Sequence, residues 1–237
     1  MSINTMNDNK IAIIIPAHNE ATTITNVICT VKKHTNAIVI VVNDASTDET
    51  RILAEHAGAT VIDLPVQLGA WGAMQAGMRY AQQEEIDIVV TFDADNQHPA
   101  ESICSLVNCI NDNCDVAIGS CVGRGTALRH FAWTLFRKLS GLEIKDLTSG
   151  FRAYNRKSYA ILTSSKASLI DYQDLGILLL LHNAGMKMSE ISVTINERLN
   201  DKSRIFNSWN KVAEYMVLTT ILVLCHKRIT LPKIPTQ

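Results

Sequence analysis

Two continuous runs of apolar, largely β-branched residues near the start of the chain restrict the folds that it can adopt. Residues 11–15 read IAIII and residues 38–42 read IVIVV. Runs without a polar side are typical of strands that are buried on both faces of a parallel sheet. Between them, residues 21–34 place apolar side chains at helical spacing, as a crossover helix requires. The sequence therefore predicts a βαβ unit at the start of an α/β domain.

The alternation of strands and helices continues beyond this unit. We expect further helices over residues 48–57, 70–84, 100–112, 126–140 and 169–184. We expect further strands over residues 60–64, 86–92, 115–119 and 188–195. Such alternation predicts an α/β fold with a doubly wound, mainly parallel sheet flanked by helices. A chain of 237 residues without an evident linker fits one such domain.

The last part of the chain differs in character from this core, so we assign residues 1–204 to the core domain and residues 205–237 to a C-terminal helix and tail. Residues 205–228 carry apolar side chains at helical spacing, and the run from Tyr215 to Cys225 is almost wholly apolar. That run is shorter than the roughly 20 residues that cross a bilayer. We therefore expect an amphipathic helix that lies on a membrane surface. A helix packed on the core or against a second subunit is the alternative.

Composition and charge exclude several classes of protein. The formal net charge is -1, whereas nucleic-acid binders present a strongly basic surface, so we expect no nucleic-acid partner. The first residues show no basic segment followed by an apolar one, which predicts a cytoplasmic protein, at most peripheral on the cytoplasmic face of a membrane. The six cysteines include no CxxC pair, and we expect them to be reduced. A dinucleotide-binding dehydrogenase is excluded because no G-x-G-x-x-G follows the first strand.

Polar residues gather where three predicted strands end. The three clusters are PAHNE at 16–20, NDASTDET at 43–50 and DADNQHP at 93–99. In open α/β sheets, ligands bind beyond the carboxyl ends of the strands. We therefore expect the functional site at the edge where these clusters meet.

The third cluster predicts a divalent metal site. Asp93 and Asp95 follow a buried strand, and two carboxylates at i and i+2 of an extended segment point the same way. Gln97 adds a neutral oxygen on that side. Such oxygen ligands suit Mg²⁺ or Mn²⁺, which typically bridges diphosphate oxygens and neutralises a leaving nucleotide. The alternative is that both aspartates cap a helix that begins near Pro99.

The first two clusters are less specific when each is considered alone. Asp44 ends the second strand, where a carboxylate can accept hydrogen bonds from a base or a ribose. The segment from Ser46 to Asp48 is more typical of a helix N-cap. Glu20 is either a charge in the first turn of a helix or a ligand contact.

Six stretches, taken together and in their order along the chain, resemble the family 2, GT-A-type glycosyltransferases, in particular the polyprenyl (dolichyl) phosphate sugar synthases. The stretches are IIPAHNE (14–20), VVNDASTDET (41–50), LGAWGAMQAGMRYA (68–81), FDADNQHP (92–99), DLTSGFRAYNR (146–156) and Glu197, Arg198, Asp201 with Ser203. The resemblance implies an enzyme that moves a sugar from a UDP- or GDP-sugar, with inversion, to an acceptor, with polyprenyl phosphate as the leading class. A soluble or polysaccharide acceptor is one alternative, and a catalytically impaired sugar-nucleotide-binding protein is another.

The resemblance also assigns roles to individual residues. It implies that the metal and the donor diphosphate are held by Asp93, Ala94, Asp95 and Gln97, which makes Asp95 a catalytic residue. It implies a nucleotide pocket lined by Pro16, His18, Glu20, Val42 and Asp44. Arg198 and Ser203 would close over the diphosphate, for which a guanidinium fork and a hydroxyl are suitable donors. The chain departs from the family pattern at His18, Asn43 and Asp201, where Tyr, Asp and Gly are usual.

Two further residues are predicted to act on the acceptor. Asp174 is a candidate general base or acceptor-orienting carboxylate, and its alternative role is to cap the following helix. Arg129 lies in a basic segment interleaved with aromatic residues and is a candidate to hold an acceptor phosphate, with a solvated helix face as the alternative. An ionised phosphate needs no base, in which case Asp174 is dispensable. The sequence leaves the sugar, the nucleotide, the acceptor and the oligomeric state open.

Overall fold

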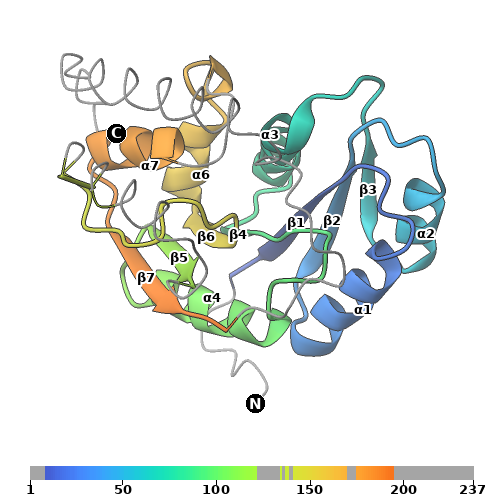
Figure 1. The fold of residues 1–237 in the computed structure, drawn as a ribbon, viewed down its shortest axis with the longest axis horizontal. Coiled ribbons are helices and arrows are strands. Elements are labelled where there is room, and N and C mark those ends of the chain that lie inside the picture. Colours follow the sequence, from blue (N-terminus) through green and yellow to red (C-terminus); the bar gives the residue numbers. More distant parts are fainter. Residues whose placement is uncertain (1–8, 122–133, 135–136, 139–140, 170–174, 195–237) are drawn as a thin grey trace.

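The computed structural model describes residues 9–121, 134, 137–138, 141–169 and 175–194, and these form one sheet with helices on both faces (Figure 1). The strands are β1 (Ile11–Ala17), β2 (Ile38–Asn43), β3 (Thr60–Asp63), β4 (Ile88–Thr91), β5 (Val116–Ser120), β6 (Arg152–Asn155) and β7 (Met188–Ser192). The α-helices are α1 (Ile24–His34), α2 (Thr50–His56), α3 (Gly69–Gln83), α4 (Ile103–Asn111), α6 (Arg156–Leu162) and α7 (Leu175–Asn183). Short 3-10 helices cover Ala100–Ser102 and Ala167–Leu169.

The sheet confirms the predicted fold class. Its strand order is β3-β2-β1-β4-β6-β5-β7. Strand β6 runs antiparallel to β4 and β5, and the other neighbouring pairs are parallel. The carboxyl ends of the parallel strands therefore share one edge of the sheet with the amino end of β6.

Strand β1 shows why its residues are all apolar. Ala12 and Ile14 belong to the core on the α3, α6 and α7 side, whereas Ile13 and Ile15 belong to the core on the α1, α2 and α4 side. All four are fully buried. Because successive side chains of a strand point to opposite faces, a strand covered on both sides needs an apolar residue at every position.

Helix α3 lies close to the sheet because Gly77 has no side chain. A Cβ placed at Gly77 would approach Ile14 Cγ2 to 2.6 Å and Val42 Cγ2 to 3.1 Å. A larger residue would push α3 away from β1 and β2, and with it the turn that precedes the helix at the functional edge.

Part of the secondary-structure prediction was wrong. Strand β6 and helix α6 were not expected. Of the helix expected over residues 169–184, the described part is helical at Leu175–Asn183, and Leu169 belongs to a 3-10 helix. Strand β6 reads RAYN, which lacks the apolar alternation by which a strand is recognised. Of the segment expected to be a basic helix, Thr134, Arg137 and Lys138 are described, and each is helical.

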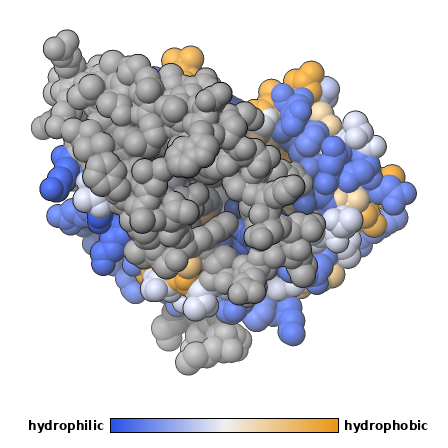
Figure 2. Space-filling model, in the orientation of Figure 1, coloured by the Kyte–Doolittle hydropathy of each residue, from blue (hydrophilic) through white to orange (hydrophobic). Residues whose placement is uncertain are grey.

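The predicted C-terminal helix and tail, residues 205–237, lie outside the described residues, so the domain boundary at 204 stays a prediction. Among the helices that the structure describes, none combines the length and the apolar character needed to cross a bilayer. On the face shown in Figure 2, the described surface is mostly hydrophilic with scattered apolar residues. Large apolar side chains that stay exposed in the described part include Ile52, Val66 and Leu68.

Candidate functional site

The three polar clusters meet at the carboxyl edge of the central strands. Ala17 at the end of β1 pairs with Asn43 at the end of β2. On the other side of β1, Ile14 pairs with Thr91 at the end of β4. The sequence-based expectation that the clusters share one edge is therefore met by the register of the sheet.

The loops after β1 and β2 are bound together by side chains. Asn19 adopts a positive φ of 55°, and its Oδ1 accepts a hydrogen bond of 2.9 Å from the amide of Thr47. Asp48 accepts from the amide of Ala21 at 3.1 Å and from the amide of Thr50 at 3.0 Å. Although desolvation opposes it, the hydrogen bonds from Thr50 and Ala21 lower the pKa of Asp48 below its usual value. Asp48 thus joins the two loops and also supports the start of α2.

Asp44 fixes the start of α3. Its side chain is buried, and its Oδ1 accepts a hydrogen bond of 2.6 Å from the amide of Leu68 while its Oδ2 accepts one of 2.9 Å from the amide of Gly69. Gly69 has a φ of +77°, a conformation that glycine adopts without strain. Both carboxylate oxygens of Asp44 therefore bind the backbone that begins α3, although each oxygen has a further lone pair for a ligand.

The other residues predicted to line the nucleotide pocket differ in exposure. Pro16, His18 and Glu20 are half-buried at the end of β1. The Nδ1 atom of His18 lies 2.7 Å from the carbonyl oxygen of Asp44, so the imidazole bridges the ends of β1 and β2. Val42 is fully buried in the core beneath α3, so its side chain has no accessible surface at this edge.

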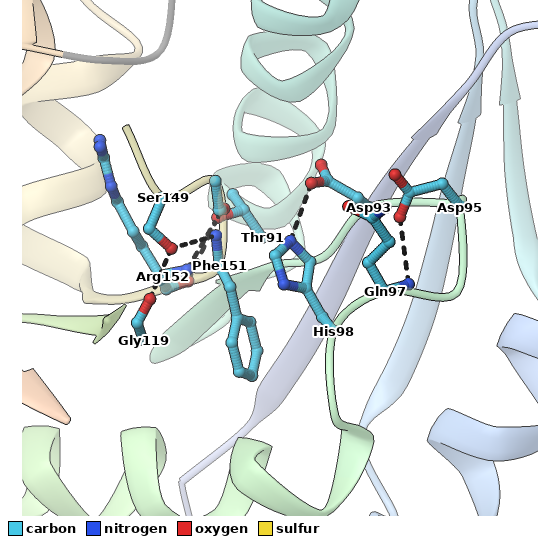
Figure 3. A network of polar contacts seen from close by, with 10 residues as sticks. Thr91, Asp93, Asp95, Gln97, His98, Gly119, Ser149, Phe151 and Arg152 are labelled. Atoms are coloured by element: carbon cyan, nitrogen blue, oxygen red, sulfur yellow. Dashed lines mark hydrogen bonds and ion pairs between the residues drawn. The ribbon is translucent and has the colours of Figure 1, made fainter. Parts of the chain in front are cut away.

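The acidic pair lies just beyond β4 (Figure 3), but the local geometry is not the extended one that we expected. Residues 94–95 form a turn, Asn96 has a φ of 63°, and Asp95 Oδ1 accepts a hydrogen bond of 3.1 Å from the amide of Gln97. The residue that precedes the 3-10 helix is Pro99, whose side chain makes no cap hydrogen bond, and the alternative capping role of the aspartates stays a prediction. Gln97 is buried, with a relative exposure of 4%.

The loop before β6 packs against this turn. Thr91 Oγ1 donates a hydrogen bond of 2.6 Å to the carbonyl of Gly150, and Ser149 Oγ donates one of 2.6 Å to the carbonyl of Gly119. A Cβ placed at Gly150 would lie 3.4 Å from both carboxylate oxygens of Asp93. The glycine therefore leaves space beside the carboxylate that any other residue would fill.

His98 is a site residue that the sequence reasoning missed. Its Nε2 lies 2.8 Å from Asp93 Oδ2, and its ring stacks on Phe151 with centroids 5.0 Å apart (Figure 3). His98 lies in the stretch FDADNQHP and Gly150 lies in TSGFR, but the spacing within each stretch did not indicate that the two meet at Asp93.

The donor set at Asp93 and Asp95 fits a hard divalent cation. Among the described residues, no group of three or more His, Cys, Asp or Glu side chains is placed to hold a metal ion. Mg²⁺ and ions like it are commonly bound by one or two carboxylates together with substrate phosphates and water. Two carboxylates, with Gln97 in the same turn and no side chain on Gly150 beside Asp93, are consistent with that kind of site.

Four predicted site residues, Arg129, Asp174, Arg198 and Ser203, lie outside the described residues. The other predicted residues, those for the metal and for the nucleotide, lie at the same edge of the sheet. Their roles at that edge stay predictions.

Comparison with known proteins identifies the family. The model of glycosyl transferase family 2 matches residues 12–164. A polyprenol monophosphomannose synthase of Mycolicibacterium smegmatis is 26% identical over 226 residues, covering 86% of this chain and 84% of the relative. An undecaprenyl-phosphate mannosyltransferase of Micrococcus luteus is 31% identical over 165 residues, covering 61% of this chain and 66% of the relative.

Solved structures agree on the fold. A glucosyl-3-phosphoglycerate synthase of Mycobacterium tuberculosis, crystallised with Mn²⁺, UDP and glucosyl-3-phosphoglycerate, has a TM-score of 0.69 at 21% identity, covering 94% of this chain and 81% of that chain. The same enzyme crystallised with Mg²⁺ and UDP has a TM-score of 0.69 at 21% identity, covering 94% of this chain and 80% of that chain. The GT-A fold implied by the sequence motifs is confirmed.

Proposed function

Because the chain belongs to glycosyl transferase family 2, we propose that it uses a divalent metal ion to move a sugar from a nucleoside-diphosphate sugar to a polyprenyl phosphate. The protein is a glycosyltransferase. The observation that carries the finer proposal is the half-exposed acidic pair Asp93 and Asp95, which follows β4 at the carboxyl edge of the sheet.

The nucleotide-sugar donor and its metal are supported by the likeness to structures that contain UDP with Mn²⁺ or Mg²⁺. In this chain, Asp93 and Asp95 would hold the cation, with Gln97 and Ala94 in the same turn beside the donor diphosphate. When bound, the cation supplies positive charge that stabilises the departing nucleotide. On the neighbouring side of β1, His18 and Asp44 are the candidates to contact the base and the ribose, with Arg198 and Ser203 as candidates to close over the diphosphate.

A lipid-phosphate acceptor is supported by relatives that are named as synthases or transferases of polyprenol or undecaprenyl phosphate sugars. A phosphate acceptor is already ionised, so it needs a cationic group that holds it and no general base. Arg129→Ala should then lower transfer far more than Asp174→Asn. A hydroxyl acceptor would reverse that order, and equal, mild effects from both variants would mean that neither residue serves the acceptor.

Association of residues 205–228 with a membrane surface would bring the enzyme to such an acceptor. We expect purified full-length protein to float with anionic liposomes at low salt and to be released at high salt, because basic residues near an anionic surface are screened by salt. A compact dimer that stays with the soluble fraction would instead identify the apolar segment as a subunit interface.

A thermal-shift screen tests the proposed donor and metal together. UDP, GDP and their sugar derivatives are added with and without Mn²⁺, because a ligand that binds only the folded state raises its apparent stability by mass action. We expect one nucleotide series to stabilise the protein, and Mn²⁺ to increase that shift. The absence of any nucleotide-dependent shift, with or without Mn²⁺, would contradict the proposal.

A further inference from the structure

Asp93 lies between solvent and a buried imidazole. The side chain of Asp93 is 41% exposed, whereas that of His98 is 4% exposed, and the two join through His98 Nε2 and Asp93 Oδ2 at 2.8 Å. An ionised carboxylate only accepts hydrogen bonds, so the Nε2 atom carries the proton and donates it. One carboxylate oxygen of Asp93 is therefore fixed from beneath by His98, on the side away from solvent.

The imidazole is itself held by two aromatic rings. His98 stacks on Phe151 with an interplanar angle of 22°, and Phe92 meets it edge-on with centroids 5.6 Å apart. Both phenylalanines are almost fully buried. These contacts set the plane of the imidazole, so the direction in which Nε2 donates is determined by packing.

The presence of an imidazole at this position needs an explanation. The Nδ1 atom of His98 is buried and has no hydrogen-bond partner in the described part of the chain. A buried polar atom without a partner destabilises the folded protein, whereas a phenyl ring would fill the same space between the phenylalanines without that cost. Within the described residues, the contact with Asp93 is the polar contact that the imidazole makes at Nε2 and that a phenyl ring would lose.

We propose that His98 is a positioning residue that orients the Asp93 carboxylate toward the metal ion, with Phe151 holding the imidazole in place. The inference rests on the proposed metal-dependent function. It gives a physical reason for the meeting of two motifs, because Phe151 and Gly150 come from TSGFR and His98 and Asp93 come from FDADNQHP. Gly150 leaves space beside Asp93 while Phe151 supports the residue beneath it.

Two variants of His98 separate the hydrogen bond from the packing. His98→Phe keeps an aromatic ring against Phe151 and removes the donor. His98→Gln keeps a donor at comparable reach and removes the ring. The readout is the Mn²⁺ concentration that gives half of the Mn²⁺-dependent thermal shift. It is measured in the presence of UDP and, separately, of GDP. Asp95→Ala is the control variant that is expected to lack this shift.

We expect His98→Phe to need about tenfold more Mn²⁺, because groups that orient a metal ligand typically change metal affinity by about 10- to 100-fold. His98→Gln should stay within about threefold of the unmodified protein, and the melting temperature of His98→Phe without ligands should be unchanged or higher. An unchanged Mn²⁺ requirement in His98→Phe, or equal weakening in both variants, would overturn the positioning role alone. If the unmodified protein showed a nucleotide shift but no Mn²⁺ effect, the proposed metal would be wrong and the positioning role with it.

A separate observation concerns two cysteines in the turn that joins α4 to β5. Cys109 near the end of α4 and Cys114 just before β5 have their sulfur atoms 2.7 Å apart. The turn between them is built by backbone hydrogen bonds, including those from Cys114 to Cys109 at 3.3 Å and from Asn113 to Ile110 at 3.2 Å. The contact of the two thiols therefore follows from the fold of the turn.

The pair is accessible from one side. A surface hollow of about 600 Å³ is lined by both cysteines together with Lys187 and Ser189. Cys114 is buried and Cys109 is partly exposed. Burial and the neighbouring Cys109 raise the pKa of the Cys114 thiol to about 12, which leaves Cys109 as the thiol that meets an oxidant first.

We propose that Cys109 and Cys114 form a disulfide by exchange with a small disulfide such as oxidised glutathione. The sulfur of Cys109 attacks one sulfur of the reagent and releases one thiol. The first step removes the Cys109 thiol, one of the causes that raise the pKa of Cys114. Cys114 then gives its proton to water and its sulfur attacks the Cys109 sulfur, which releases the second glutathione as a thiolate that takes up a proton, so the protein loses two hydrogen atoms and the reagent gains them. The hollow is lined by one basic and one acidic side chain, Lys187 and Asp112, so its charge does not strongly repel the reagent.

Peptide mapping tests this proposal on the folded, full-length protein. After exposure to oxidised glutathione, remaining thiols are alkylated and the chain is cut before Asp112 and Asp115. We expect two peptides joined through Cys109 and Cys114, loss of the link in Cys109→Ser, and its retention in the control Cys104→Ser. Cys29 is exposed, so glutathione attached to Cys29 shows that the reagent has reacted with the protein. Glutathione on Cys29 with both Cys109 and Cys114 still alkylated would overturn the proposal.

Discussion

Asp44 and Asp93 follow strands on either side of β1, at the same edge of the sheet, yet they are held in different ways. Asp44 is 3% exposed and accepts hydrogen bonds from two backbone amides at the start of α3. Asp93 has a side chain that is 41% exposed and is held from beneath by the side chain of His98. A buried carboxylate that binds backbone amides mainly stabilises the fold, whereas a half-exposed carboxylate oriented by a buried side chain is suited to a ligand.

The largest expected effect tests the β4 side of this comparison. Asp95→Ala should lower the rate of sugar transfer by more than about 100-fold, because the metal charge contributes several kcal/mol to transition-state stabilisation. The same variant should melt close to the unmodified protein. Steady-state transfer assays and thermal unfolding measure the two quantities.

Asp95→Asn is the control for local structure, because an amide oxygen can still accept the hydrogen bond from Gln97. It should lose activity as Asp95→Ala does. Full activity of either variant in the presence of a chelator would contradict the assignment of a metal to Asp93 and Asp95.

The next effect tests the β2 side. Asp44→Ala should lower the free energy of unfolding by about 2 kcal/mol, because the amides of Leu68 and Gly69 lose a charged acceptor and a hydrogen bond to a charged group contributes about 1.5–3 kcal/mol, which water partly replaces at these exposed residues. Asp44→Asn should lose less, since its oxygen still accepts one amide. Urea unfolding measures both values, and a change below about 0.5 kcal/mol in Asp44→Ala would break the comparison.

A smaller effect is expected at Gly150. Gly150→Ala places a methyl group in van der Waals contact with both oxygens of Asp93 and should lower kcat/KM about tenfold by restricting access to the carboxylate. Gly119→Ala is a matched variant in the adjacent strand, where a Cβ would meet Phe151 at 2.6 Å. It should lower stability more than Gly150→Ala does. An active Gly150→Ala enzyme with unchanged Mn²⁺ dependence would show that the space beside Asp93 is not used.

The smallest effect concerns Asp48, which joins the loops after β1 and β2. Its pKa is lowered in the folded protein, so its contribution to stability is present above the pKa of the unfolded chain, near 3.8. That contribution is lost as the pH falls through the lower, folded pKa. The urea midpoint of the unmodified protein should therefore fall between pH 5 and pH 3, and that of Asp48→Asn should fall less. The difference should be small because Asp48 is exposed. Identical pH profiles would contradict the role of the carboxylate.

The sequence predicted the parts of the molecule that follow simple periodic rules. The apolar runs of β1 and β2 predicted a parallel sheet, and the polar residues after these strands indicated the functional edge. Strand β6 was missed because its buried Arg152 and its Asn155 break the expected pattern. The roles of His98 and Gly150 were missed because they depend on the packing of residues more than 50 positions apart, which no local spacing encodes.

The most direct test of the account is the transfer reaction itself. Purified full-length protein is incubated with Mn²⁺, undecaprenyl phosphate and UDP- or GDP-sugars that carry a radiolabel in the sugar, and the label in the lipid extract is measured. The account predicts a labelled lipid with one nucleotide series, lost in chelator and absent with Asp95→Ala. A protein that binds the nucleotide but yields no labelled lipid with any donor, or one whose lipid labelling is undiminished in chelator, would contradict it.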